Sequence, residues 1–299
     1  MKTLSEIHIR DPFILPVKEE GEGVYYLYGT TGKTAWSGQP SGFNVYRSRD
    51  LVNWDGPAPA FRPDDDFWSD HHYWAPEVHH YGNHYYMLAS FKAEGISRAT
   101  QILIAEHPQG PFRPHGQGPV TPADWECLDG TLFLDDAGSP WMVFCREWLQ
   151  VTDGEMYAVR LTAELDGTIG EPQLLFHASE APWSVGSPKG EYVTDGPFLH
   201  RLEDGGLVML WSSQGSQGYA MGLARSQSGS IAGPWTQDAE PLFAKDGGHG
   251  MLFRDFSDRL LLTIHTPNSH PDERPVIIEV KEENRTLVIR DQGDEYLHR

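Results

Sequence analysis

The chain has 299 residues, which is enough for two ordinary domains or for one large all-β domain with a buried core. Only 39% of the residues are hydrophobic, yet 10 Trp, 12 Tyr and 13 Phe argue against disorder. The net charge of −20 disfavours nucleic acid and anionic membranes as partners, so we expect neither, and a small neutral ligand fits the charge better.

Residues 1–10 contain no apolar segment typical of a signal peptide, and no apolar run approaches the roughly 18 residues of a membrane span. We therefore expect a cytoplasmic protein. The two cysteines, Cys127 and Cys145, are too few for a disulfide framework and are expected to be free thiols.

Five short segments share one pattern: a leading residue, then Pro or Gly, then any residue, then two mostly apolar positions. The leading residues are Asp11, Ala75, Asp129, Asp195 and His249, which lie 64, 54, 66 and 54 positions apart. A repeat of this length is typical of stacked or radial architectures.

Each leading segment is followed by a second apolar and aromatic run, at residues 25–31, 85–91, 141–148, 207–213 and 260–266. Turn residues separate the two runs, as in a hairpin. A third run follows at residues 43–48, 100–106, 156–161, 219–225 and 276–280. Antiparallel strands in every unit, with no helical period, predict an all-β, five-bladed β-propeller that fills residues 1–299 as one domain. A β-sandwich is the alternative, but it does not predict equivalent residues at five regular places.

The start of each first strand and the end of each second strand should lie at one face of a propeller. Asp11, Asp129, Asp195 and His249 are therefore predicted to meet around one pocket. Inverting glycoside hydrolysis uses one carboxylate to activate water and a second to protonate the leaving oxygen, about 6.5–9.5 Å apart. A third acid can raise the pKa of the proton donor. A single Asp-Gly or Asp-Pro more often forms a turn than a catalytic site. The hypothesis of an active site therefore rests on three aspartates at matching positions of the repeat.

These segments resemble glycoside hydrolase family 43, whose members are five-bladed propellers that cleave arabinosides and xylosides with inversion. The resemblance covers about residues 9–290 and rests on Arg10-Asp11-Pro12, Trp74-Ala75-Pro76-Glu77-Val78, Leu128-Asp129-Gly130 and Thr194-Asp195-Gly196-Pro197. It implies that Asp11 is the general base and that Asp129 orients the acid and tunes its pKa. Asp195 occupies the position of the general acid, where the family has Glu. His249 is similar to an axial histidine. We expect no required cofactor, and the resemblance leaves room for a structural calcium or sodium ion near His249.

Glu147 is a second candidate for the general acid, because Asp195 is one methylene shorter than the family's Glu. It ends the second strand of the unit that Asp129 begins, so hairpin pairing brings it to the same face. An ion pair with Arg146 or another neighbour is the alternative role. Weaker candidates are Glu180, Glu191 and Glu126, the last in a segment similar to the acid motif of family 32 fructosidases.

Sugar rings stack on aromatic side chains, and Trp74 and Trp148 are the best candidates for such a wall. Loop tryptophans that could extend it are Trp36, Trp68 and Trp183. His71 and His72 are predicted to bind sugar hydroxyls. Arg146 and His265, which end second strands, complete the predicted binding set.

The sequence thus predicts an inverting glycoside hydrolase that releases arabinofuranose or xylose from small plant-derived oligosaccharides. The alternative is a sugar-binding propeller with weak or no turnover, because Asp replaces Glu at position 195. A protein-interaction propeller is a third possibility, but such a scaffold has no need of an acidic channel mouth.

Overall fold

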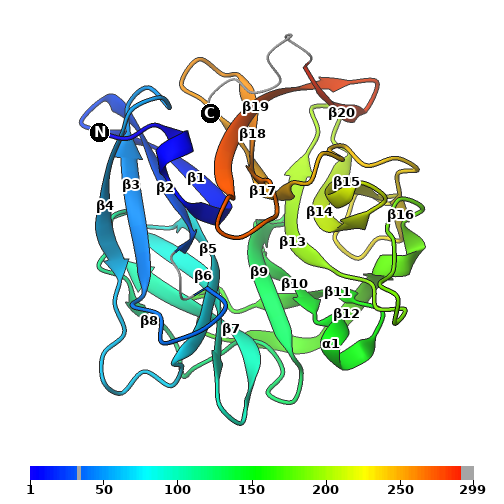
Figure 1. The fold of residues 1–299 in the computed structure, drawn as a ribbon, viewed down its shortest axis with the longest axis horizontal. Coiled ribbons are helices and arrows are strands. Elements are labelled where there is room, and N and C mark those ends of the chain that lie inside the picture. Colours follow the sequence, from blue (N-terminus) through cyan, green and yellow to red (C-terminus); the bar gives the residue numbers. More distant parts are fainter. Residues whose placement is uncertain (32–34, 291–299) are drawn as a thin grey trace.

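The computed structural model describes residues 1–31 and 35–290, so residues 291–299 of the predicted domain lie outside the described part. Five four-stranded sheets are arranged around a common centre (Figure 1). Within each sheet the strands follow chain order and pair antiparallel with their neighbours. The predicted five-bladed β-propeller is confirmed.

The first blade consists of β1 (Ile9–Glu19), β2 (Glu22–Thr31), β3 (Phe43–Ser48) and β4 (Trp54–Phe61). The second consists of β5 (His71–Tyr81), β6 (His84–Ala93), β7 (Ile96–Ala105) and β8 (Arg113–Pro114). The third consists of β9 (Cys127–Leu134), β10 (Pro140–Arg146), β11 (Glu155–Leu161) and β12 (Thr168–His177). The fourth consists of β13 (Asp195–Arg201), β14 (Leu207–Gly215), β15 (Gly218–Ser226) and β16 (Trp235–Gln237). The fifth consists of β17 (Gly248–Arg254), β18 (Leu260–Thr266), β19 (Arg274–Glu283) and β20 (Thr286–Ile289).

Helical structure in the described residues is limited to η1 (Leu4–Glu6), α1 (Trp148–Val151) and η2 (Ala178–Glu180). None of these helices has the length or hydrophobicity that crossing a membrane would require.

The ring closes between the first and the fifth blade. First strands of adjacent blades contact one another all around the centre, and β1 completes the circle by contacting β17, β18 and β19. Buried side chains fill the space between blades: the rings of Phe61 and Phe91 lie 6.0 Å apart across the first and second blades, and those of Phe176 and Trp211 lie 5.3 Å apart across the third and fourth. Tight packing of large aromatic side chains therefore fixes the angle between neighbouring blades.

Every first strand contains a β-bulge near its start, and the residue at the bulge has a positive φ. The values are 51° at Asp11, 46° at Ala75, 58° at Asp129, 50° at Gly196 and 45° at His249. A bulge redirects the side chain that it carries, which explains why Pro or Gly follows the leading residue in the sequence repeat. At Gly196 a Cβ atom would also lie 2.6 Å from His249 Cδ2, so the fourth blade has no room for a side chain there.

The bulges correct the predicted repeat by one residue in the fourth blade. Gly196 occupies the position of Asp11 and Asp129, whereas Asp195 pairs with Ser212 just before the bulge, as Arg10 pairs with Thr30. The sequence pattern was ambiguous because Asp195-Gly196 and Gly196-Pro197 both match a leading residue followed by Pro or Gly.

Each bulge N–H donates a hydrogen bond to the preceding blade. Side chains at the end of a second strand accept four of these bonds: Thr30 from Ala75 (2.7 Å), Ser90 from Asp129 (2.9 Å), Ser212 from His249 (2.9 Å) and His265 from Asp11 (3.2 Å). The equivalent residue of the third blade is Cys145, and here Asp129 Oδ2 accepts the N–H of Gly196 at 3.0 Å. These bonds link successive blades beside the predicted site.

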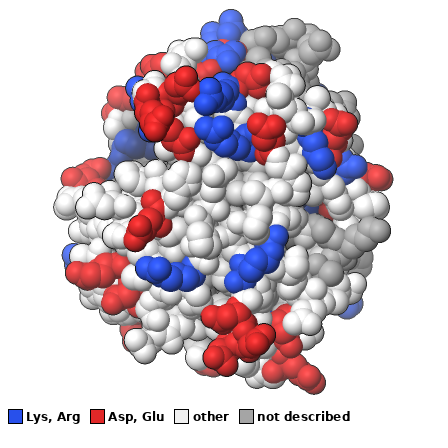
Figure 2. All heavy atoms as spheres, turned by 90° about the vertical axis from the view of Figure 1, so that its left-hand side faces the viewer, with Lys and Arg blue, Asp and Glu red and all other residues white. Residues whose placement is uncertain are grey.

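Figure 2 shows the side of the molecule that faces left in Figure 1. Acidic and basic side chains lie next to one another in its upper part, and a band of uncharged side chains crosses its middle. Among the described residues on this face, the acidic side chains therefore alternate with basic ones and do not form one continuous acidic patch.

Replacing Thr30 by Val should destabilise the protein by about 1–3 kcal/mol, because the buried N–H of Ala75 would lose its acceptor. Urea unfolding would measure the change. Thr263→Val is the matched control: Thr263 is equally buried, but its hydroxyl has no hydrogen-bond partner among the described residues, so its loss should be neutral or stabilising. Equal losses in both variants would contradict the role of the Thr30 hydrogen bond.

Candidate active site

A cavity of about 400 Å³ opens at the face where the bulges converge. Most of the predicted site residues line it: Asp11, His72, Trp74, Asp129, Glu147, Trp148, Asp195 and His249. The four acids come from first strands and from the end of one second strand, as the hairpin argument predicts. Ala75, the leading residue of the second blade, contributes no polar group.

Asp11 is held by the first and fifth blades. The hydroxyl of Thr30 donates to its Oδ2 at 2.6 Å, and His249 Nδ1 lies 3.2 Å from its Oδ1. Burial acts to raise the pKa of Asp11, but His249, the adjacent Arg10 and the Thr30 hydrogen bond outweigh burial, so the pKa lies below its usual value. Asp11 is therefore an ionised carboxylate at neutral pH.

Asp129 lies on the other side of His249, whose Nδ1 is 3.6 Å from Asp129 Oδ2. Burial and the negative charge of Asp11 raise the pKa of Asp129 well above its usual value, and the hydrogen bond from the Gly196 N–H opposes this shift. Two adjacent carboxyl groups thus prefer opposite protonation states.

Asp195 accepts a hydrogen bond from the hydroxyl of Tyr219, which lies 2.9 Å from its Oδ2. Burial and the nearby Asp129 raise the pKa of Asp195 to about 7, while His249 and the Tyr219 hydroxyl act in the opposite direction. A carboxyl group with this pKa can carry a proton near neutral pH and release it during a reaction.

Glu147 precedes α1 and is buried, with 3% of its surface exposed. Burial raises its pKa, and Arg98 opposes the shift through a guanidinium Nε that lies 3.6 Å from Glu147 Oε2. The ion-pair partner of Glu147 is thus Arg98 and not Arg146, which pairs with Glu155 instead.

An aromatic wall covers the side of the cavity next to Glu147. Arg98 stacks over Trp74 at 3.8 Å, and His72 stacks on the same tryptophan with ring centroids 4.7 Å apart. Trp36 packs edge-on against Trp74 at 5.2 Å and also lines the cavity. A flat, partly apolar surface beside several hydrogen-bonding groups is suited to a sugar ring.

Three residues of the predicted binding set do not line this cavity. His71 is half exposed and forms an ion pair with Asp70. Arg146 stacks over Trp125 at 4.2 Å. His265 is fully buried behind the site, where its Nδ1 accepts the N–H of Asp11 and burial lowers its pKa to about 4.

The weaker candidates have structural partners elsewhere. Glu126 binds Lys92 Nζ with both oxygens, at 2.8 and 2.6 Å. Glu180 accepts the N–H of His177, and Glu191 accepts the hydroxyl of Ser187. Of the loop tryptophans, Trp36 lines the cavity, whereas Trp183 packs against Trp211 with ring centroids 4.8 Å apart and Trp68 bonds Gln101.

Sequence reasoning missed Arg98, Tyr219 and Asn268, all of which line the cavity. Arg98 and Tyr219 lie near the starts of the third strands β7 and β15, which the argument from first and second strands did not consider. The third strand pairs with the second at this face, as Tyr219 does with Gln214. Extending the hairpin rule by one strand would have found both residues.

The predicted calcium or sodium ion beside His249 would have two carboxyl groups within reach, those of Asp11 and Asp129. The Nδ1 atom of His249 lies near Asp11 Oδ1 and Asp129 Oδ2, while Thr30 donates to the other oxygen of Asp11 and the Gly196 N–H donates to Asp129 Oδ2. Calcium prefers six to eight oxygen ligands. An ion near His249 stays a prediction, and we derive no chemical step through it.

Residues 4–289 match the sequence profile of "Glycosyl hydrolases family 43". The chain belongs to this family. Membership supports glycoside hydrolase activity on a carbohydrate substrate, in agreement with the cavity of acids and tryptophans.

Known relatives of this family 43 chain act on different sugars. A solved structure described as an endo-arabinase from Bacteroides thetaiotaomicron is 43% identical, covers 94% of this chain and 97% of its own, and superimposes with a TM-score of 0.86. An endo-1,4-beta-xylanase structure from the same organism is 23% identical over 97% of both chains, with a TM-score of 0.78, and shows the shared fold. A curated relative from Emericella nidulans, "Probable arabinan endo-1,5-alpha-L-arabinosidase A", is 22% identical over 213 residues, which span 70% of this chain and 59% of that protein.

Replacing Asp195 by Asn should change how stability depends on pH. The native protein keeps a proton on Asp195 up to about pH 7, whereas the unfolded chain releases it above about pH 4. Wild-type stability should therefore fall as the pH rises from 4 to 7, and the penalty should be fully present above pH 7. Asp195→Asn cannot ionise, so it should exceed wild type at pH 8 by up to about 4 kcal/mol and match it near pH 4.

Chemical unfolding at several pH values would measure this difference. Asp124→Asn is the control, because Asp124 is exposed and does not line the cavity, so a change that both variants share is not specific to Asp195. A constant offset between wild type and Asp195→Asn from pH 4 to 8 would show that Asp195 is not held protonated.

Proposed function

We propose that this family 43 chain is an inverting glycoside hydrolase that cleaves α-L-arabinofuranosyl linkages in oligosaccharides derived from arabinan. The observation that carries the mechanism is the pairing, in one cavity, of the ionised Asp11 with Asp195, whose pKa of about 7 leaves it protonated below neutral pH. The choice of arabinofuranose is supported by the 43% identity to the endo-arabinase structure over nearly the whole of both chains. Xylose remains the second candidate because a xylanase structure shares the fold.

In the proposed reaction Asp11 accepts a proton from a water molecule, which attacks the anomeric carbon from the face opposite the leaving group. Asp195 donates its proton to the glycosidic oxygen as the bond to the anomeric carbon breaks. The Tyr219 hydroxyl orients the Asp195 carboxyl group through its hydrogen bond to Oδ2. Burial and Asp129 together raise the pKa of Asp195, and Asp129 also accepts the Gly196 N–H at the start of the strand that carries Asp195.

In this proposal Glu147 binds substrate and does not donate the proton. Its contact with Arg98 and its position beside Trp74 and Trp148 suit a carboxylate that binds a sugar hydroxyl. Its raised pKa and longer side chain also make it the rival for proton donation.

Asp11→Asn should reduce kcat by about a thousandfold while sugar binding is retained, because the amide cannot accept a proton from water. The substrates are an aryl α-L-arabinofuranoside, an aryl β-D-xyloside and short linear arabinan. Proton NMR of the first product formed by the wild type should show the β-anomer of arabinose, as inversion requires.

Three outcomes would contradict the proposal. An α-anomer would exclude inversion, and near-normal turnover by Asp11→Asn would exclude this base. Binding of arabino-oligosaccharides without turnover by the wild type would favour the sugar-binding alternative.

The general acid can be identified by comparing Asp195→Asn with Glu147→Gln. Loss of the acid should affect poor leaving groups most, because an activated aryl group departs with little protonation. We expect Asp195→Asn to lose at least about a hundredfold on arabino-oligosaccharides but far less on a dinitrophenyl arabinofuranoside. The kcat/KM of the wild type is expected to fall above about pH 7 as Asp195 loses its proton, and Asp195→Asn should not show this fall.

Glu147→Gln should instead raise KM for both substrates and keep the alkaline limb of the pH profile. The opposite result would be that Glu147→Gln loses more activity on poor leaving groups and no longer shows the fall in kcat/KM at high pH. In that case Glu147 is the proton donor and Asp195 is not.

A further inference from the structure

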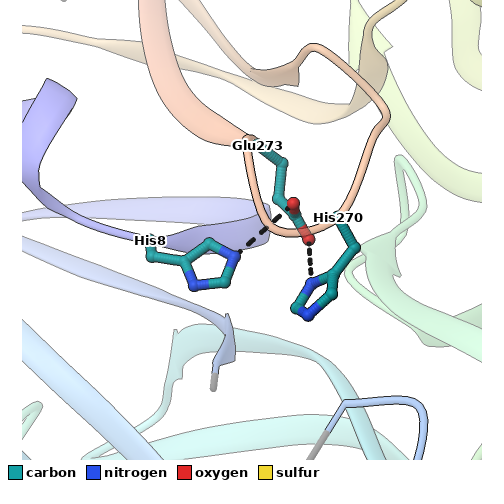
Figure 3. A group of neighbouring side chains, drawn as sticks. All are labelled: His8, His270 and Glu273. Carbon is teal, nitrogen blue, oxygen red and sulfur yellow. Dashed lines mark hydrogen bonds and ion pairs between the residues drawn. The ribbon is translucent and has the colours of Figure 1, made fainter. Parts of the chain in front are cut away.

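A group of three metal-ligating side chains lies outside the active-site cavity, at the junction of the first and fifth blades. His8 precedes β1, while His270 and Glu273 lie in the loop between β18 and β19 (Figure 3). One ligand atom from each of the three lies within 4.8 Å of the other two. In Figure 3 both imidazole rings point toward the carboxylate of Glu273.

Glu273 is the unusual member of this group, because its side chain is only 1% exposed. His270 Nδ1 lies 3.1 Å from Oε1, at hydrogen-bond distance. The other oxygen, Oε2, is buried and accepts no hydrogen bond, and His8 Nε2 contacts it at 3.5 Å. A buried carboxylate oxygen without a hydrogen bond is costly, so this atom is able to take a further ligand.

We propose that His8, His270 and Glu273 bind a divalent transition-metal ion of the zinc type, with water completing the coordination. Two imidazoles and one carboxylate are a common ligand set for zinc. Bonds of about 2.0–2.1 Å in a tetrahedral site place ligand atoms roughly 3.3 Å apart. His270 Nδ1 lies 3.1 Å from Oε1 and His8 Nε2 lies 3.5 Å from Oε2, and one ligand atom of each residue lies within 4.8 Å of the other two, so small side-chain movements would bring the three ligands to this spacing. The side chains of His8 and His270 are 28% and 32% exposed, which gives an ion access from solvent.

Two arginines oppose a cation at this place. Arg10 Nη1 lies 3.7 Å from Glu273 Oε1, and Arg274 follows Glu273 in the chain. Each has other acceptors: Arg10 Nη2 donates to Asn268 Oδ1 at 2.6 Å, and Arg274 donates to the carbonyl oxygens of Ser5 and Pro271 at 2.9 Å. If an ion binds the Glu273 carboxylate, both guanidinium groups therefore keep other hydrogen-bond acceptors.

A metal at this site would link the residues before the first strand of the propeller to the loop before β19 in the last blade. It would thus fasten the ring at its point of closure. Because a ligand that binds only the folded state stabilises it, the protein should become more resistant to unfolding in the presence of the ion.

The test is titration of protein that carries no histidine tag with Co²⁺, followed by visible absorption, and with Zn²⁺, followed by calorimetry and thermal unfolding. The wild type should take up one ion at this site, show the absorption of a low-coordinate Co²⁺–imidazole site, and gain thermal stability with Zn²⁺. His8→Gln and His270→Gln should each weaken binding at least tenfold and lose most of the Zn²⁺-dependent rise in Tm.

His107→Gln is the matched control, because His107 lies 3.6 Å from a single glutamate, Glu19, and forms no part of the three-residue group. It should bind both ions as the wild type does. Circular dichroism would confirm that each variant is folded. If one of the two histidine variants does not fold, the other is enough to test the proposal. No uptake of Co²⁺ or Zn²⁺ by the wild type, or uptake equal in wild type and both variants, would overturn the proposal.

Discussion

The hydrogen bond from each bulge N–H to the preceding blade is the contact on which both the ring and the site depend. A buried N–H at a position of positive φ needs an acceptor, and a strained backbone persists only where its surroundings hold it. Thr30 illustrates the consequence: it accepts the N–H of Ala75 and donates to the carboxylate of Asp11. One hydroxyl therefore joins two blades and orients the proposed base, so the site is built from the contacts that join the blades.

The third junction departs from this arrangement, and the departure explains the charge pattern of the site. Cys145 stands where the other blades carry Thr, Ser or His, and the carboxylate of Asp129 accepts the Gly196 N–H in its place. Asp129 is thus fixed between Asp11 and the strand that begins with Asp195. Burial and the neighbouring Asp129 raise the pKa of Asp195 to about 7, while His249 and Arg10 keep the pKa of Asp11 low despite burial. Three similar residues acquire different protonation states because each has different neighbours.

Much of the fold and part of the site could be predicted from the sequence, because a leading residue followed by Pro or Gly marks the bulge that turns a side chain into the cavity. The pattern could not decide which residue of the fourth blade lies at the bulge, since Asp195-Gly196-Pro197 satisfies it twice.

The pattern also could not predict which side chains outside the bulges line the cavity. Two register shifts in β5 separate His71 from Glu77, so alternation along that strand could not show that His71 does not line the cavity. Arg98 reaches the site from the third strand β7, so an argument limited to first and second strands could not include it.

The closing junction of the ring connects the proposed base to residues far from it in the sequence. The N–H of Asp11 is held by His265, whose Nε2 faces Asn268 Oδ1 at 3.0 Å, and the same oxygen accepts a hydrogen bond from Arg10. Arg10 in turn approaches Glu273, which contacts both His8 and His270. The residues that complete the propeller therefore also determine where Asp11 lies. Any lost side chain that loosens the closure acts on the position of the base as well as on the stability of the ring, because the two share Arg10.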